Sequence, residues 1–271
     1  MHGAVENTAS DDRRQDWREV AEFARIAFGV TGLLHGGLAL TRRPFSTESR
    51  DTPAIVYGIG LFGPTVAAIV VEHRHHGRSG VRELLRSGHP RTMSWGPAAA
   101  ALVAQPLMQL SAARMSRRQV RVRHVVPLLA LGQLWVVAGE EYGWRGFVWP
   151  RLSRRIGPVK ATLVIAAMWG LWHFPMFFVP QSLQAEDRVF RFGSAILAWS
   201  FLHSLLQLER ASVATAMVLH AATNLSSQAL DIDLEHSSRA LTGVYAAVAA
   251  TAAASMGLRG PRSRSSSRLG R

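Results

Sequence analysis

The residues of this sequence best suited to chemistry are acids, an arginine and histidines that interrupt otherwise apolar stretches. The first group is the pair Glu140 and Glu141, which ends an apolar run and is followed by Arg145. Glu141 and Arg145 are four residues apart, so a helix brings them to one face as an ion pair. Glu140 points about 100° away and stays free of that pair, as a general base or acid requires. The alternative interpretation is an ordinary helix end that meets water with an exposed ion pair.

Two histidines occupy apolar segments further along the chain. His173 follows an aromatic run and precedes Pro175, which should disturb the backbone hydrogen bonding there. His220 and Asn224 are four residues apart, so both side chains project from one helix face and could hydrogen-bond a polarised carbonyl. Taken singly, each histidine is equally well interpreted as a polar packing contact between helices.

The combination of these groups is more informative than any one of them. Unpaired ionisable side chains in apolar helices are costly, and one shared polar cavity satisfies them together. Such a cavity suits a hydrolase, a proton or ion pathway, or a ligand-binding site. His35 and His203 also lie in apolar segments, but neither has a polar partner at helical spacing, so we interpret both as structural. The run from His73 to His76 is expected to form a solvated loop.

Apolar stretches of nearly membrane-spanning length must position these side chains. A span needs about 20 mostly apolar residues. We therefore predict an all-α fold, a polytopic transmembrane helix bundle of about eight spans, with seven possible. The predicted spans are 24–40, 53–71, 95–113, 125–139, 159–179, 190–206, 213–230 and 241–258.

Composition supports a membrane protein. The chain is 48% hydrophobic, and its 31 basic against 18 acidic residues give a net charge of +13. The basic residues lie between apolar spans, so we expect anionic lipid headgroups as partners, and no nucleic acid. With both termini in the cytoplasm, the inner loops carry more Arg and Lys than the outer ones, although the basic loop 114–124 argues against this orientation. The absence of cysteine excludes disulfides and thiolate chemistry.

Three regions are expected along the chain. Residues 1–23 form a polar N-terminal segment that does not resemble a cleavable signal peptide, so the first span should act as an uncleaved anchor. Residues 24–258 form the transmembrane domain, whose motif core is 120–230. Residues 259–271 are rich in Arg, Ser and Gly and are expected to be disordered. We expect an integral protein of the cell membrane.

The polar motifs resemble those of the CAAX protease and bacteriocin-processing (CPBP, Abi) family of intramembrane metalloproteases, in particular the type II CAAX prenyl endopeptidases. Glu140, Glu141 and Arg145 match the family's Glu-Glu-x-x-x-Arg motif. Trp169 and His173 match a second motif, in which an aromatic residue precedes a histidine by four positions. His220 and Asn224 match the third. The resemblance is strongest over about residues 120–230.

The resemblance implies hydrolysis of a peptide bond in a membrane-associated protein or peptide, such as a prenylated C-terminal tail. The expected general base is Glu140, which would activate a water molecule held by His173. Glu141 and Arg145 would brace the site, and His220 and Asn224 would stabilise the oxyanion. A divalent metal, zinc first, would use His173, His220 and Glu140 as ligands; a metal-free glutamate mechanism is the alternative.

Two other functions are compatible with the same polar residues. One is a non-catalytic membrane immunity or assembly factor that binds peptides through the cavity. The other is a proton-coupled transporter. Transporters often show internal repeats or paired broken helices, and this sequence shows neither.

Overall fold

The computed structural model confirms the predicted helical membrane bundle. It describes residues 2–42, 52–124, 127–185, 187–208, 212–232 and 234–258, so the predicted basic tail lies outside the described residues. Helices account for most of this part of the chain. The elements are α1 (His2–Thr41), α2 (Thr52–Gly60), α3 (Gly63–Ser87), η1 (Pro90–Thr92), α4 (Trp95–Met115), β1 (Val120–Val122), α5 (Pro127–Glu141), η2 (Tyr142–Val148), α6 (Trp149–Ile156), α7 (Pro158–Trp172), η3 (Phe174–Phe178), α8 (Val189–Gln207), α9 (Val213–Ala229), β2 (Leu230–Ile232) and α10 (Leu234–Leu258).

The described residues of the eight predicted spans lie mainly in helices, although the span 53–71 divides between α2 and α3 at Leu61 and Phe62. Five of the described helical segments are long and apolar enough to cross a membrane. The polar N-terminal residues and the first span share one helix, α1. The other three predicted spans coincide with α4, α5 and α9. Of these, α5 has 15 residues and α9 has 17, which is short for a full crossing. The five candidate spans are Arg14–Thr41, Thr52–Ser87, Pro158–Phe178, Val189–Gln207 and Ser237–Leu258.

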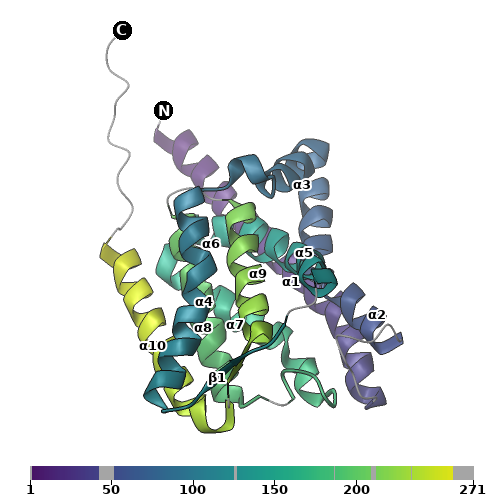
Figure 1. The fold of residues 1–271 in the computed structure, drawn as a ribbon. Coiled ribbons are helices and arrows are strands. Elements are labelled where there is room, and N and C mark those ends of the chain that lie inside the picture. The colour runs from purple at the N-terminus through teal and green to yellow at the C-terminus, as the bar shows by residue number, and fades with distance from the viewer. Residues whose placement is uncertain are drawn as a thin grey trace.

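The helices pack around two groups of buried side chains. Figure 1 shows α1 crossing the molecule diagonally from the N-terminus at the upper left to α2 at the lower right, with α3 at the upper right and α10 at the left. The larger core joins α1, α3, α6 and α7 around aromatic side chains such as Phe23, Trp144 and Phe147. A second core joins α4, α8 and α10.

A short antiparallel β-ribbon was not predicted. β1 pairs with β2 through the Cα partners Val120 and Ile232, Arg121 and Asp231, and Val122 and Leu230. β1 precedes α5 in the chain and β2 follows α9 directly. The ribbon therefore ties together the ends of the two helices that carry the acid pair and His220.

The prediction of a loop at His73–His76 is wrong. These residues lie in α3, which kinks only at Gly77, where φ is 64°. Glycine adopts this left-handed conformation at little cost. The polar sequence suggested a loop, but acidic side chains of α1 compensate the histidines: His76 Nε2 lies 3.2 Å from Glu19 Oε1, and His75 Nε2 lies 3.0 Å from Glu22 Oε2.

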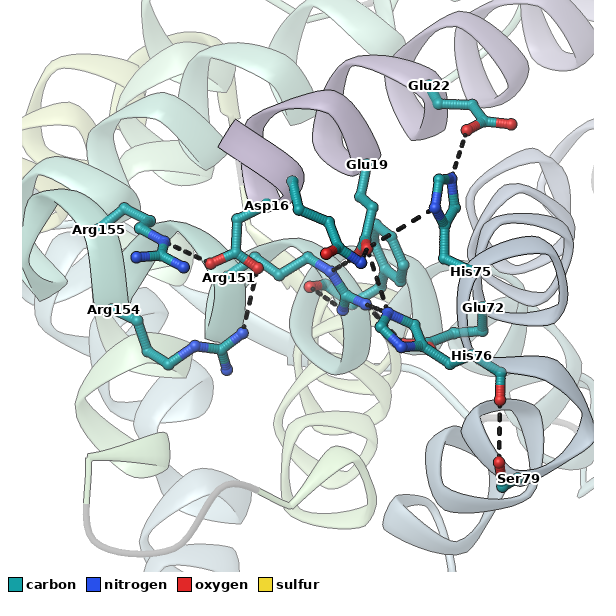
Figure 2. A network of polar contacts seen from close by, with 12 residues as sticks. Asp16, Glu19, Glu22, Glu72, His75, His76, Ser79, Arg151, Arg154 and Arg155 are labelled. Carbon is teal, nitrogen blue, oxygen red and sulfur yellow. Dashed lines mark hydrogen bonds and ion pairs between the residues drawn. The ribbon is translucent and has the colours of Figure 1, made fainter. Parts of the chain in front are cut away.

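A network of ion pairs holds α1, α3 and α6 together at this end of the molecule. Figure 2 shows Arg151 of α6 at its centre. The buried guanidinium donates from Nε to Glu19 Oε2 at 2.7 Å and from Nη2 to Glu72 Oε1 at 3.0 Å. Asp16 contacts both Arg154 and Arg155 at the edge of the network. The three helices are thus fixed to one another just beyond the segment that carries Arg145.

Candidate active site

The acid pair lies where a regular helix changes form. Glu140 and Glu141 end α5, and the next seven residues form a π-helix, which contains Arg145. Such wide turns are rare and are frequent at functional sites. Glu140, Glu141 and Arg145 are all almost completely buried, with exposed fractions of 2%, 0% and 2%. The alternative of a helix end exposed to water is therefore wrong.

Glu141 is the more heavily bonded of the two acids. Its Oε1 accepts hydrogen bonds from Arg145 Nη1 at 3.2 Å and lies 2.7 Å from Nδ1 of His220. The expected i, i+4 ion pair is present. The contact to His220 adds a second helix, α9, to the same carboxylate. One oxygen of the Glu141 carboxylate thus contacts side chains from two helical segments.

Glu140 points away from the ion pair, as the helical spacing predicts. Its Oε2 accepts a hydrogen bond of 2.7 Å from the indole Nε1 of Trp169. Trp169 is 2% exposed and lies on α7. Its ring carries the guanidinium of Arg145 at 4.2 Å from the centroid. Trp169 thus contacts both Glu140 and Arg145 of the Glu-Glu-x-x-x-Arg motif.

His173 lies at the C-terminal end of α7, next to this cluster. Its ring meets the Trp169 ring at a centroid distance of 5.8 Å, and Nδ1 lies 2.8 Å from the Trp169 carbonyl oxygen. Because a carbonyl only accepts, Nδ1 is the donor and Nε2 carries the free lone pair. The α-helix ends at Trp172 and a 3-10 helix containing Pro175 follows. His173 is partly exposed, unlike the acids.

The two residues of the third motif, His220 and Asn224, contact different partners on α5. His220, 7% exposed, packs against Trp169 with a centroid distance of 5.6 Å and bonds Glu141. Asn224 Nδ2 instead donates to Gln133 Oε1 of α5 at 2.8 Å. The structure therefore brings Glu140, Glu141, Arg145, His173 and His220 together around Trp169. Asn224 contacts the same helix pair one turn further along α9.

Two further residues of this region, His203 and Gln133, were not predicted as site residues. His203 of α8, interpreted as structural, is 1% exposed and places Nε2 at 3.9 Å from Glu141 Oε2. Its polar partner lies on another helix, so no helical spacing could reveal it. Gln133 was also missed. Its position seven residues before Glu140, two turns along the same face, was the available indication.

Close packing of the backbone at two glycines fixes the position of the acid pair relative to α2 and α3. A Cβ atom on Gly139 would lie 2.8 Å from the Leu61 carbonyl oxygen, and one on Gly143 would lie 2.5 Å from Pro64 Cβ. Contacts this short do not occur, so only glycine fits at either position. The end of α5 and the start of η2 thus lie directly against the turn between α2 and α3.

The residues as placed do not fit a three-ligand zinc site. Nδ1 of His173 and Nδ1 of His220 both face oxygen atoms and leave Nε2 free, which is the usual arrangement of metal-ligating histidines. Within the described residues, however, no group of three or more His, Asp or Glu side chains is arranged to hold a metal ion. The metal therefore stays a prediction.

Comparison with known proteins matches the motif region. Residues 122–226 match the family model described as type II CAAX prenyl endopeptidase Rce1-like. Over 119 residues the chain is 34% identical to the CAAX prenyl protease 2 of Methanococcus maripaludis. That alignment covers 40% of this chain and 42% of the relative, so the chain spans less than half the length of the protein it matches. The predicted resemblance is confirmed over the region that holds all six predicted site residues.

Proposed function

We propose that this chain is an intramembrane endopeptidase acting on a membrane-associated protein or peptide, since residues 122–226 match the family model of type II CAAX prenyl endopeptidases. The observation that carries the proposal is the convergence of Glu140, His173 and His220 around Trp169, inside a bundle of apolar helices. A base, a second polar group and a hydrogen-bond donor in one buried place are the parts needed for hydrolysis by water.

In the proposed reaction Glu140 removes a proton from a water molecule that also bonds Nε2 of His173. The hydroxide oxygen attacks the carbonyl carbon of the scissile bond and forms a tetrahedral oxyanion. The Trp169 N–H holds the Glu140 carboxylate in place. The carbon–nitrogen bond then breaks, and Glu140 returns the proton to the leaving amine.

His220, as an imidazolium whose Nδ1–H is held by Glu141, is proposed to donate its Nε2–H to the oxyanion. Glu141 bonds Nδ1 and so fixes the ring, while Arg145 balances the carboxylate charge. Asn224 donates one of its two amide N–H groups to Gln133, so the second N–H remains for the oxyanion in the proposed mechanism.

Replacement of Glu140 by glutamine tests the proposal. The purified chain in lipid nanodiscs should cleave a farnesylated C-terminal peptide, the substrate class that the name of the relative indicates. Glu140→Gln should lower kcat by about 100- to 10,000-fold, because a general base contributes that much. Glu83→Gln, an exposed acid of α3, is the matched control and should retain activity. Equal cleavage by Glu140→Gln and the unaltered chain would overturn the proposal, and so would full function of that variant in cells.

We propose the metal-free alternative, in which Glu140 activates the water without a bound ion. We therefore expect a chelator to leave the cleavage rate unchanged. Loss of activity on chelation, with recovery on zinc addition, would instead make His173, His220 and Glu140 the first ligands to mutate.

The proposed orientation puts both termini in the cytoplasm, with the basic loops against anionic headgroups. The sequence contains no cysteine, so single cysteines can be introduced without background. A cysteine at Ser79, near the ion-pair network, should react with a membrane-impermeant maleimide only after cells are opened. Labelling of intact cells would reverse the orientation.

A further inference from the structure

Three polar atoms remain without a partner among the described residues beside the acid pair. They are Glu141 Oε2, Arg145 Nη2 and His203 Nε2, and each is buried. The first two belong to groups already joined through Glu141 Oε1 and Arg145 Nη1, 3.2 Å apart. The third lies 3.9 Å from Glu141 Oε2. Buried polar atoms in native proteins nearly always have a partner, which is often a water molecule.

The protonation of His203 follows from its other ring nitrogen. Nδ1 lies 2.7 Å from the carbonyl oxygen of Trp199, one helical turn earlier. Because that oxygen only accepts, Nδ1 carries the proton and the neutral ring leaves a bare lone pair at Nε2. Nε2 and Glu141 Oε2 are therefore two acceptors that face each other, at a distance too long for a direct hydrogen bond.

These two acceptors and one donor match the two protons and one lone pair of a single water molecule. Glu141 Oε2 and His203 Nε2 each accept one of its protons, and Arg145 Nη2 donates to its oxygen. A separation of 3.9 Å between the two acceptors suits a bridging water. A metal ion suits the place less well, because the guanidinium of Arg145 would repel it.

We infer that one water molecule is bound between Glu141, His203 and Arg145, and that His203 is a positioning residue for the Glu141 carboxylate. Through this water, His203 fixes Oε2 while Arg145 and His220 bond Oε1. The carboxylate plane is then fixed, and with it the ring of His220. The inference rests on the proposed peptidase function for its kinetic consequence, but the water site stands on geometry alone.

Two variants of His203 separate its Nε2 role from simple packing. In His203→Gln the side-chain amide reaches the former Nε2 position and still accepts from the water. In His203→Asn the amide reaches only the Nδ1 position. Gln207→Leu is the matched control, because Gln207 lies one turn later on α8, is 3% exposed and has amide atoms that also lack a partner among the described residues.

We expect His203→Leu and His203→Asn to lower kcat by about 10- to 100-fold, since small misplacements of catalytic groups have effects of this size. KM should stay within about twofold, because His203 does not touch the substrate. His203→Gln should recover most of the rate, and Gln207→Leu should match the unaltered chain. Equal rates for His203→Gln and His203→Asn, or an undiminished rate for His203→Leu, would overturn the positioning role.

An experimental structure at a resolution that shows water tests the site without any activity. Density within hydrogen-bond distance of all three atoms, lost in His203→Leu, supports the inference. Direct contact of His203 with Glu141, or a metal ion with scattering above that of water, overturns it. If the unaltered chain and Glu140→Gln are equally inactive on the peptide, the proposed function fails, and the structural comparison still decides the water site.

Discussion

Trp169 donates its indole N–H to Glu140 and lies against the rings of His173, His203 and His220. The same ring carries the guanidinium of Arg145. A phenylalanine at this position would keep the ring but lose the N–H donor. The indole therefore has two separable roles, which are to fill the space between three helices and to orient one carboxylate.

Replacement of Trp169 by phenylalanine should lower kcat by about 10- to 100-fold, because Glu140 loses the donor that orients it. The matched control is Trp172→Phe on the same helix, where an equally buried indole donates to Thr31 at 2.8 Å. Each variant loses one buried hydrogen bond, and each should lose about 1–3 kcal/mol of stability. Kinetics and melting temperatures together decide the result: a similar loss of kcat in both variants would contradict the orienting role of Trp169.

Helical spacing predicted the contacts that lie within one helix and failed for those between helices. It placed Glu141 beside Arg145 and turned Glu140 away from them, and both features are observed. The sequence predicted that His220 shares a polar cavity with the acid pair, but it did not predict the direct contact between His220 and Glu141. The His203 contact was missed because nothing in the sequence states which face of α8 meets α5.

At the scale of elements, the π-helix Tyr142–Val148 and the β-ribbon hold α5 at both ends. The ribbon joins its beginning to the end of α9, and Gly143 lets its far end lie on Pro64. Neither feature has a clear sequence pattern. The apolar run before Glu140 predicted a single span. The wide turns of the π-helix that follows it, and the pairing of β1 with β2, depend on packing against other helices.

Gly143→Ala should destabilise the chain by about 1–3 kcal/mol, because an added methyl group would meet Pro64 at impossible distances. Activity should fall as well, since the acid pair would move. Gly132→Ala on α5 provides the contrast: a Cβ there meets nothing within 4 Å, and alanine favours a helix by about 0.5–1 kcal/mol. Thermal unfolding in detergent measures both, and equal melting temperatures for the two variants would refute the close contact.

At the scale of the whole molecule, Arg151 joins three helices that are distant in the sequence. Its guanidinium bonds Glu19 of α1 and Glu72 of α3 from its place on α6. The sequence predicted basic loops facing lipid headgroups, but this arginine is 7% exposed and faces inward. Such inward ion pairs fix how helices are arranged, although they are not by themselves a large source of stability.

Arg151→Leu should destabilise the chain by about 3–5 kcal/mol, because it leaves two buried carboxylates without their cation. Arg154→Leu removes an ion pair with Asp16 at the surface, where the Arg154 side chain is 59% exposed. This change should cost less than about 1 kcal/mol of stability. Chemical denaturation of both variants in mixed micelles gives the comparison. A small effect of Arg151→Leu would mean that Glu19 and Glu72 find other partners.

The π-helix also separates two rotational phases within one continuous stretch of backbone. A residue advances an α-helix by about 100°, and the wider turns between Glu141 and Trp149 place everything after them out of step with α5. Deletion of one residue here would let the backbone close ordinary α-turns. Six residues in α-turns cover nearly the same rotation as seven in π-turns, so Arg151 would keep its direction towards Glu19 and Glu72, as Glu140 keeps its own. The seven residues Tyr142–Val148 therefore act as one inserted residue within a longer helix: a deletion there alters the packing of this segment, while the helices on either side keep their directions.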